Sequence, residues 1–188
     1  MKKIINALVI GLMSFSCYAE TPQITRMNAT TGAVTWELHA HGVHFSLTQI
    51  LVEQAQAFYI NRGFTLKQIT PYSSSCIYMA VLRNDTAPGT IHFIRDNWSI
   101  LVDEKPHLLI SVNEWVQRFT TKNIKKSALI AFRWAQFPVE QEYEPGGDWN
   151  QGMLSVGLPP ESKFDVIARW DIDGKVNEIT LQGIQCAK

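Results

Sequence analysis

Residues 164–184 read FDVIARWDIDGKVNEITLQGI, and this stretch decides the fold class. Apolar and polar side chains alternate on both sides of Asp173-Gly174, a dipeptide that favours a two-residue hairpin turn with positive φ at both positions. The pattern predicts an antiparallel hairpin in which Arg169 lies opposite Glu178. One face of this hairpin would pack in a core, and the other would face solvent.

The same alternation recurs nearer the N-terminus. Residues 34–42 place Trp36 and Leu38 on one side and Glu37 and His39 on the other, as in a half-buried strand. Further strands are predicted at residues 76–83, 90–94, 98–102, 106–112 and 127–137. Short strands separated by Pro, Gly and Asn turns predict a mainly β domain, an antiparallel β-sandwich of immunoglobulin-like or cupredoxin-like type. A barrel is the alternative.

Two helices are expected in this domain. Ser46 and Gln49 have the spacing of a capping box, apolar residues follow at helical intervals, and Gly63 is placed to end the helix. The pattern predicts a helix near residues 47–61. A short second helix is expected near residues 113–119, where apolar side chains fall on one face.

The first 19 residues have the order of a secretory signal peptide. Two lysines precede an apolar run of about a dozen residues, too short to span a bilayer, and small residues follow it. We expect cleavage after Ala19, which leaves residues 20–188 as a single domain in the periplasm or outside the cell. A lipoprotein anchored at Cys17 is the alternative, but Ser14 stands where the lipidation signal usually has Leu.

Two cysteines, Cys76 and Cys186, remain once the leader is removed. In an oxidising compartment such a pair most simply forms a disulfide. The bond would close a loop of about 110 residues and would stabilise the fold by roughly 4–5 kcal/mol in the chain-entropy model. Two free thiols or a thiolate metal site are the alternatives.

The charge balance argues against two classes of partner. The sequence has 17 Lys and Arg and 17 Asp and Glu, so its formal net charge is zero. Proteins that bind nucleic acids or anionic membranes normally carry a basic patch or stripe. The sequence offers only the short group Lys122, Lys125 and Lys126, so neither partner is expected. No later segment is long and apolar enough for stable membrane insertion.

The histidines suggest a metal site. On an extended strand, His39 and His41 would project from one face beside Glu37, with His44 at the strand end, and neutral imidazoles so placed can share a transition-metal ion. Copper leads the divalent affinity order, so it is expected ahead of zinc. Met153 is a candidate additional ligand. The alternative is that these histidines are solvated residues on an outer strand face.

The sequence therefore predicts an exported, periplasmic metal-binding protein that binds or handles copper. The alternative is a metal-free interaction module that docks on another envelope protein, either through an uncovered sheet edge or through residues 146–153, where Asp148 and Trp149 are candidate contacts. Sequence motifs of hydrolases are absent, so no catalytic residue is assigned and an enzyme is unsupported.

Overall fold

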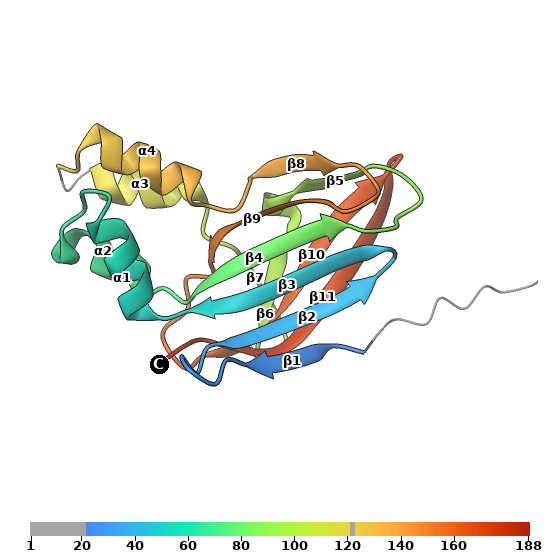
Figure 1. Cartoon of the computed structure of the whole chain (residues 1–188), viewed down its shortest axis with the longest axis horizontal. Coiled ribbons are helices and arrows are strands. Elements are labelled where there is room, and N and C mark those ends of the chain that lie inside the picture. The colour runs from blue at the N-terminus through green and yellow to red at the C-terminus, as the bar shows by residue number, and fades with distance from the viewer. Residues whose placement is uncertain (1–21, 121–122) are drawn as a thin grey trace, which may run out of the picture.

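The structure, a computed structural model, describes residues 22–120 and 123–188 (Figure 1). The predicted signal peptide at residues 1–19 and the lipidation alternative at Cys17 lie outside the described residues. No helix in the described ranges is long and apolar enough to cross a membrane.

Two antiparallel sheets pack against each other, as predicted for a β-sandwich. The first sheet has the order β1 (Ile24–Met27), β2 (Val34–Ala40), β3 (Val43–Ile50), β4 (Ile77–Asn84) and β9 (Asp148–Ser155). The second has the order β7 (Lys105–Leu108), β6 (Ser99–Val102), β10 (Lys163–Ile172), β5 (Ile91–Ile94) and β8 (Glu140–Tyr143), and β11 (Lys175–Gln185) also pairs with β10.

A lobe of four helices stands at one end of the sandwich (Figure 1). Its helices are α1 (Val52–Ile60), α2 (Leu66–Ser73), α3 (Val112–Thr120) and α4 (Lys126–Trp134). A single 3₁₀ turn, η1 (Arg95–Asn97), joins β5 to β6. The short helix expected near residues 113–119 is confirmed as α3.

The C-terminal hairpin is confirmed in its register. Arg169 pairs with Glu178, and their side chains form a salt bridge of 3.0 Å. Asp173 and Gly174 have φ values of 52° and 77°, as the expected turn requires. The alternating residues of β10 face the core, where Trp170 is buried.

Two helix and strand predictions are wrong. Residues 43–50 form strand β3, so the helix expected from residue 47 begins only at Val52. Backbone pairing with β2 and β4 on both sides outweighs the local helical spacing, since Phe45 and Leu47 face the core with period 2. The strand expected at residues 127–137 is instead helix α4.

Helix α4 buries a different set of side chains from the one that a strand would bury. Ala128 and Phe132, four residues apart, are buried against the other helices. Ile130 is 43% exposed and Trp134 is 86% exposed, whereas a strand over residues 127–137 would have placed both on the same face as the buried Phe132. The short apolar run fits both periods, and only packing in the lobe decides between them.

A buried polar network joins the lobe to the first sheet. The Tyr72 hydroxyl donates to Gln136 Oε1 at 2.9 Å, and Gln136 Nε2 donates to the Tyr59 oxygen at 2.8 Å. The Tyr59 hydroxyl in turn donates to the sulfur of Met153 at 3.1 Å. Burial raises the pKa of both phenols, so they stay neutral donors.

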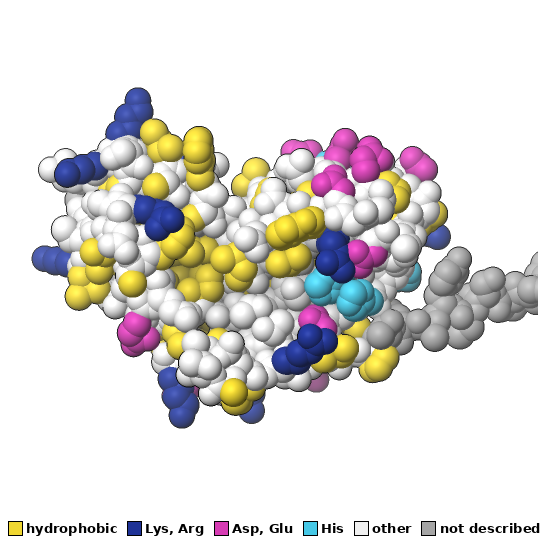
Figure 2. Space-filling view, viewed as in Figure 1, with side chains coloured by type: hydrophobic (Ala, Val, Ile, Leu, Met, Phe, Trp, Pro, Cys, Tyr) yellow, Lys and Arg dark blue, Asp and Glu magenta, His cyan; other side chains and the backbone are white. Residues whose placement is uncertain are grey.

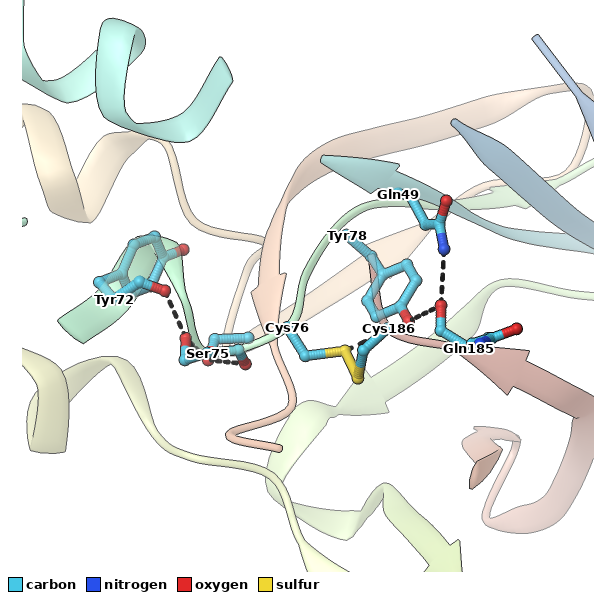
Figure 3. Close-up of a disulfide and its surroundings, with 8 residues drawn as sticks. Gln49, Tyr72, Ser75, Cys76, Tyr78, Gln185 and Cys186 are labelled. Carbon is cyan, nitrogen blue, oxygen red and sulfur yellow. Dashed lines mark hydrogen bonds between the residues drawn. A yellow bond between two sulfur atoms is a disulfide. The ribbon is translucent and has the colours of Figure 1, made fainter. Parts of the chain in front are cut away.

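The disulfide between Cys76 and Cys186 is confirmed, with Cα atoms 5.2 Å apart (Figure 3). Cys76 stands between the lobe and β4, and Cys186 follows β11, so the bond joins the two sheets beside the lobe. The Gln185 carbonyl next to it accepts hydrogen bonds from Gln49 Nε2 at 2.7 Å and from the Tyr78 hydroxyl at 2.8 Å.

We expect the double variant Cys76→Ser/Cys186→Ser to lose about 4 kcal/mol of unfolding free energy, because the bond spans 110 residues of chain. Urea unfolding of oxidised and reduced protein would measure this difference. The reduced wild type serves as the matched control and should unfold with the same midpoint as the variant. A variant as stable as the oxidised wild type would contradict the role assigned to this bond.

Candidate functional site

Strand β2 presents His39 and Glu37 on the outer face of the first sheet. Trp36, Leu38 and Ala40 point to the core and are buried, so the predicted alternation over this strand is confirmed. Figure 2 shows histidine side chains, in cyan, on this exposed face next to basic and acidic groups.

His41 does not stand beside His39, and this part of the metal prediction is wrong. Strand β2 ends at Ala40, and His41 and Gly42 form a turn with φ values of 53° and 77°. The Gly42 carbonyl accepts bonds from the backbone N–H groups of Asp85 at 3.0 Å and Thr86 at 2.9 Å. A Cβ at position 42 would overlap the backbone of residues 86–87, so this close contact requires glycine.

The partner of His39 is His44, which faces it across the turn on β3. Their rings are stacked, with centroids 4.4 Å apart and planes 14° apart. Both ring nitrogens of His44 are shielded from solvent and have no hydrogen-bond partner in the described structure. Burial, and then the neighbouring charges of His39 and Arg83, lower the pKa of His44, so its imidazole is neutral at pH 7.

The nearest carboxylates are already paired with arginines. Glu37 accepts from Arg26 at 2.7 Å, and Asp85 accepts from Arg83 at 2.5 Å. Asp85 Oδ2 also lies 3.7 Å from His39 Nδ1. Within residues 22–120 and 123–188, no group of three or more His, Cys, Asp or Glu side chains is placed to hold a metal ion.

Met153 is not available as a ligand beside these histidines. It lies within β9 rather than on a loop, it is 4% exposed, and its sulfur accepts the Tyr59 hydroxyl. Its flexible thioether fills the junction between sheet and lobe.

Asp148 and Trp149 begin strand β9, directly after a turn at Pro145-Gly146-Gly147. Gly146 N–H and Gly147 N–H donate to the carbonyls of Asp85 and Asn84, which holds this turn against the end of β4. Asp148 caps the turn by accepting from Glu144 N–H at 3.2 Å. The Trp149 side chain is half exposed on the outer face.

The first half of β9 is an open sheet edge. Successive residues of a strand direct their backbone groups to alternate edges. Met153 bonds away from β4, to Ala135 and Phe137, so Gln151 and Trp149 also point away from β4. Gln151 N–H bonds only to the neighbouring Asn150 Oδ1, and no described backbone pairs with this edge over residues 148–151.

The other sheet edges carry features that discourage added strands. Charged side chains, proline and side-chain bonds to the backbone are the usual protections. The residues concerned are Arg26 in β1, Lys105 and Pro106 in β7, Glu140 and Glu142 in β8, and Gln23, which bonds to the backbone of Gln182 in β11. In the open half of β9, Asp148 is charged but stands at the start of the strand, where it accepts from Glu144 N–H, and Trp149, Asn150 and Gln151 are uncharged.

A histidine clamp on the second sheet escaped prediction. His92 on β5 lies between two carboxylates, with Nδ1 3.0 Å from Asp171 on β10 and Nε2 2.9 Å from Glu140 on β8. These contacts raise the pKa of His92, with the Glu140 contact the larger cause. Because His92, Asp171 and Glu140 come from three separate strands, no spacing in the sequence predicts that they meet.

A cavity of about 370 Å³ adjoins this clamp. Its charged lining is already paired, because Arg169 bonds to Glu178 and to the Asn97 carbonyl and Asp171 contacts His92, although the buried Trp170 Nε1 has no partner among the described residues. The clamp therefore ties β8 to β10 and leaves little unsatisfied polarity for a ligand.

No family model, curated protein or solved structure matches this chain.

We expect the clamp to give the unfolding free energy a pH dependence. Because the pKa of His92 is raised in the folded protein, the stability that its contacts contribute is fully present below the unfolded-state pKa of about 6.5. It is lost as pH rises through the folded-state pKa. Urea unfolding of wild type and His92→Gln should therefore differ most at low pH. His107→Gln, at an exposed position on β7, should follow the wild type at every pH.

Proposed function

We propose that this chain is an exported interaction module that binds an extended segment of a partner protein as an added strand along β9. The observation that supports this function is the open edge at residues 148–151, beside the half-exposed Trp149. An extended peptide gains main-chain hydrogen bonds from such an edge, while side-chain pockets give specificity.

Trp149 is the expected anchor of this contact. Trp, Tyr and Arg dominate the binding energy of protein interfaces, and a Trp side chain buries a large area with only two rotatable bonds. Four other tryptophans, Trp36, Trp98, Trp115 and Trp170, are buried in the cores. The exposure of Trp149 on this open edge thus favours a binding role.

The strand register extends the contact beyond the edge. Across the outer face, His39, His44, Arg83 and Trp149 are successive partners on β2, β3, β4 and β9. An added strand would place its own side chain next to Trp149 in this row. The partner would therefore present an apolar or aromatic residue there, with polar residues on either side.

Export is part of the same proposal. The predicted leader at residues 1–19 and the Cys76–Cys186 disulfide both support an oxidising location outside the cytoplasm. We place the module in the periplasm or the external medium, where another envelope protein is the expected partner.

A proline at position 151 tests the edge directly. Gln151 N–H takes no part in pairing with β4, so Gln151→Pro should fold normally yet block an added strand. We expect a photo-crosslinker at Asn150 to capture one partner in the native compartment from wild type and from the control Gln151→Ala. Capture should be lost in Gln151→Pro and reduced roughly tenfold in Trp149→Ala.

Equal capture by all four proteins, with unchanged thermal stability, would show that the edge is not the contact surface.

A second candidate is metal binding by His39 and His44, and the unpartnered nitrogens of His44 favour it. A buried polar group without a partner requires an explanation, and a neutral imidazole is the form that binds copper or zinc. The nitrogen lone pairs lie in the ring planes, and stacked rings 14° from parallel do not direct them to a common point, so at least one ring must rotate for both to bind one ion. Water or a partner protein would complete the coordination.

Titration of Cu(II), Cu(I) and Zn(II) into the chain from Glu20 onward tests this candidate. Wild type and the control His107→Ala should take up one ion, copper more tightly than zinc. His44→Ala should bind at least about tenfold more weakly. Equal, weak uptake by all three proteins would remove metal binding from consideration.

A further inference from the structure

The sequence has equal numbers of basic and acidic residues, but the folded protein distributes them unevenly between the lobe and the sandwich. Over residues 52–73 and 110–134, which build the lobe, the described residues include six basic and two acidic side chains. The described remainder of the chain has eight basic and fourteen acidic side chains. The molecule therefore has a basic helical end and an acidic sandwich, and Figure 2 shows dark blue groups spread over the lobe and magenta groups on the opposite end.

The lobe ends in a convex surface formed by the end of α1 and the starts of α2 and α4. Gly63, after α1, would place a Cβ 3.7 Å from Ala128 of α4, and the Phe64 ring lies 5.2 Å from Phe119. These contacts bring the two separated segments together. We call this surface the lobe tip; its members are Ile60, Arg62, Leu66, Lys67, Lys125 and Lys126.

Apolar and basic side chains are mixed at the lobe tip. Leu66 is 52% exposed and Ile60 is 43% exposed. The lobe that carries them stands at the end of the molecule opposite the β8–β9 turn (Figure 1). Exposed apolar side chains beside basic ones are the combination that enters the headgroup boundary of a bilayer.

The positive charge of the lobe tip is not neutralised within the protein. Lys67, Lys125 and Lys126 form no ion pair with any described residue. The Arg62 guanidinium lies 3.4 Å from the centroid of the Phe58 ring and donates to the Phe58 carbonyl, with no carboxylate in contact.

The helix ends add to this positive charge. Helices α2 and α4 both begin at the lobe tip, so the positive ends of their dipoles point outward. Neither has an acidic residue in its first turn, where such residues are favoured, and Lys67 and Lys126 occupy those turns instead. This arrangement costs stability in the isolated protein and is relieved when an anion approaches.

We propose that the lobe tip binds the surface of an anionic phospholipid bilayer. The headgroup phosphates would meet Lys67, Lys125 and Lys126, while Leu66 and Ile60 would enter the boundary between headgroups and acyl chains. The acidic sandwich would be repelled from the same surface, so the molecule would stand upright on the bilayer. The open half of β9, which starts at the β8–β9 turn, would then lie at the end of the molecule away from the bilayer (Figure 1).

From the sequence alone, no binding to anionic membranes was expected, and the folded structure changes that prediction. The short basic group Lys122, Lys125 and Lys126 is insufficient alone, but folding adds Arg62 and Lys67 from a segment about 60 residues earlier. The membrane contact would be peripheral and reversible, because no described helix is able to span a bilayer.

Vesicle sedimentation tests the proposal with the chain from Glu20 onward, which contains every described element and lacks the apolar leader. We expect binding to phosphatidylcholine vesicles that contain phosphatidylglycerol, little binding to pure phosphatidylcholine, and weakening at high salt. Lys67→Glu/Lys126→Glu should bind roughly tenfold or more weakly. The matched control Lys163→Glu/Lys175→Glu, at exposed positions on the sandwich, should stay within about twofold of wild type.

Insertion has a separate readout in a thiol-linked, environment-sensitive dye, because the two cysteines of the chain from Glu20 onward are held in the disulfide. The dye on Leu66→Cys should shift its emission to the blue with anionic vesicles, whereas the same dye on Val176→Cys, exposed on β11, should not. Three results would each overturn the proposal. The first is equal binding to vesicles with and without phosphatidylglycerol, and the second is an equal loss of vesicle binding in Lys163→Glu/Lys175→Glu. The third is binding to the soluble polyanion heparin that is as tight as binding to vesicles, with no emission shift at position 66. None of them bears on the β9 edge, whose test uses different residues.

Discussion

The position of β3 between β2 and β4 is the constraint on which the rest of the first sheet depends. Backbone bonds on both of its edges hold residues 43–50 extended, although part of this segment has helical spacing. The same pairing fixes the register that aligns His39, His44, Arg83 and Trp149 in one row across four strands. Strand β3 therefore determines which residues neighbour the stacked imidazoles of His39 and His44 and the exposed Trp149.

The features that could be predicted from the sequence are those that depend on residues close together in the chain. The C-terminal hairpin was predictable because Asp173-Gly174 imposes its turn without help from distant residues. His41-Gly42 is a similar turn signal, because it separates two stretches in which apolar and polar side chains alternate. A turn predicted at these two residues would have placed His39 opposite His44. Helix α4 was missed because Phe132 and Trp134 fit a strand as well as a helix until the lobe buries one and exposes the other.

The candidate surfaces were harder to predict because each combines distant segments. The edge of β9 is open only because no other strand reaches it, which is a fact of topology rather than of residues 148–151. The lobe tip joins residues 60–67 to residues 125–126, and the His92 clamp joins three strands. Sequence patterns report the faces of single elements, whereas these surfaces are properties of their assembly.

The late position of β10 in the chain has a consequence for how the molecule is made. Strand β10 pairs with β5, β6 and β11, so the second sheet cannot close until residues 163–185 have emerged. Until then, the apolar faces of β2, β3 and β4 have no opposing layer. A chain delivered from its N-terminus would therefore expose these apolar faces to solvent until its last strands arrive, and such a state is prone to aggregation.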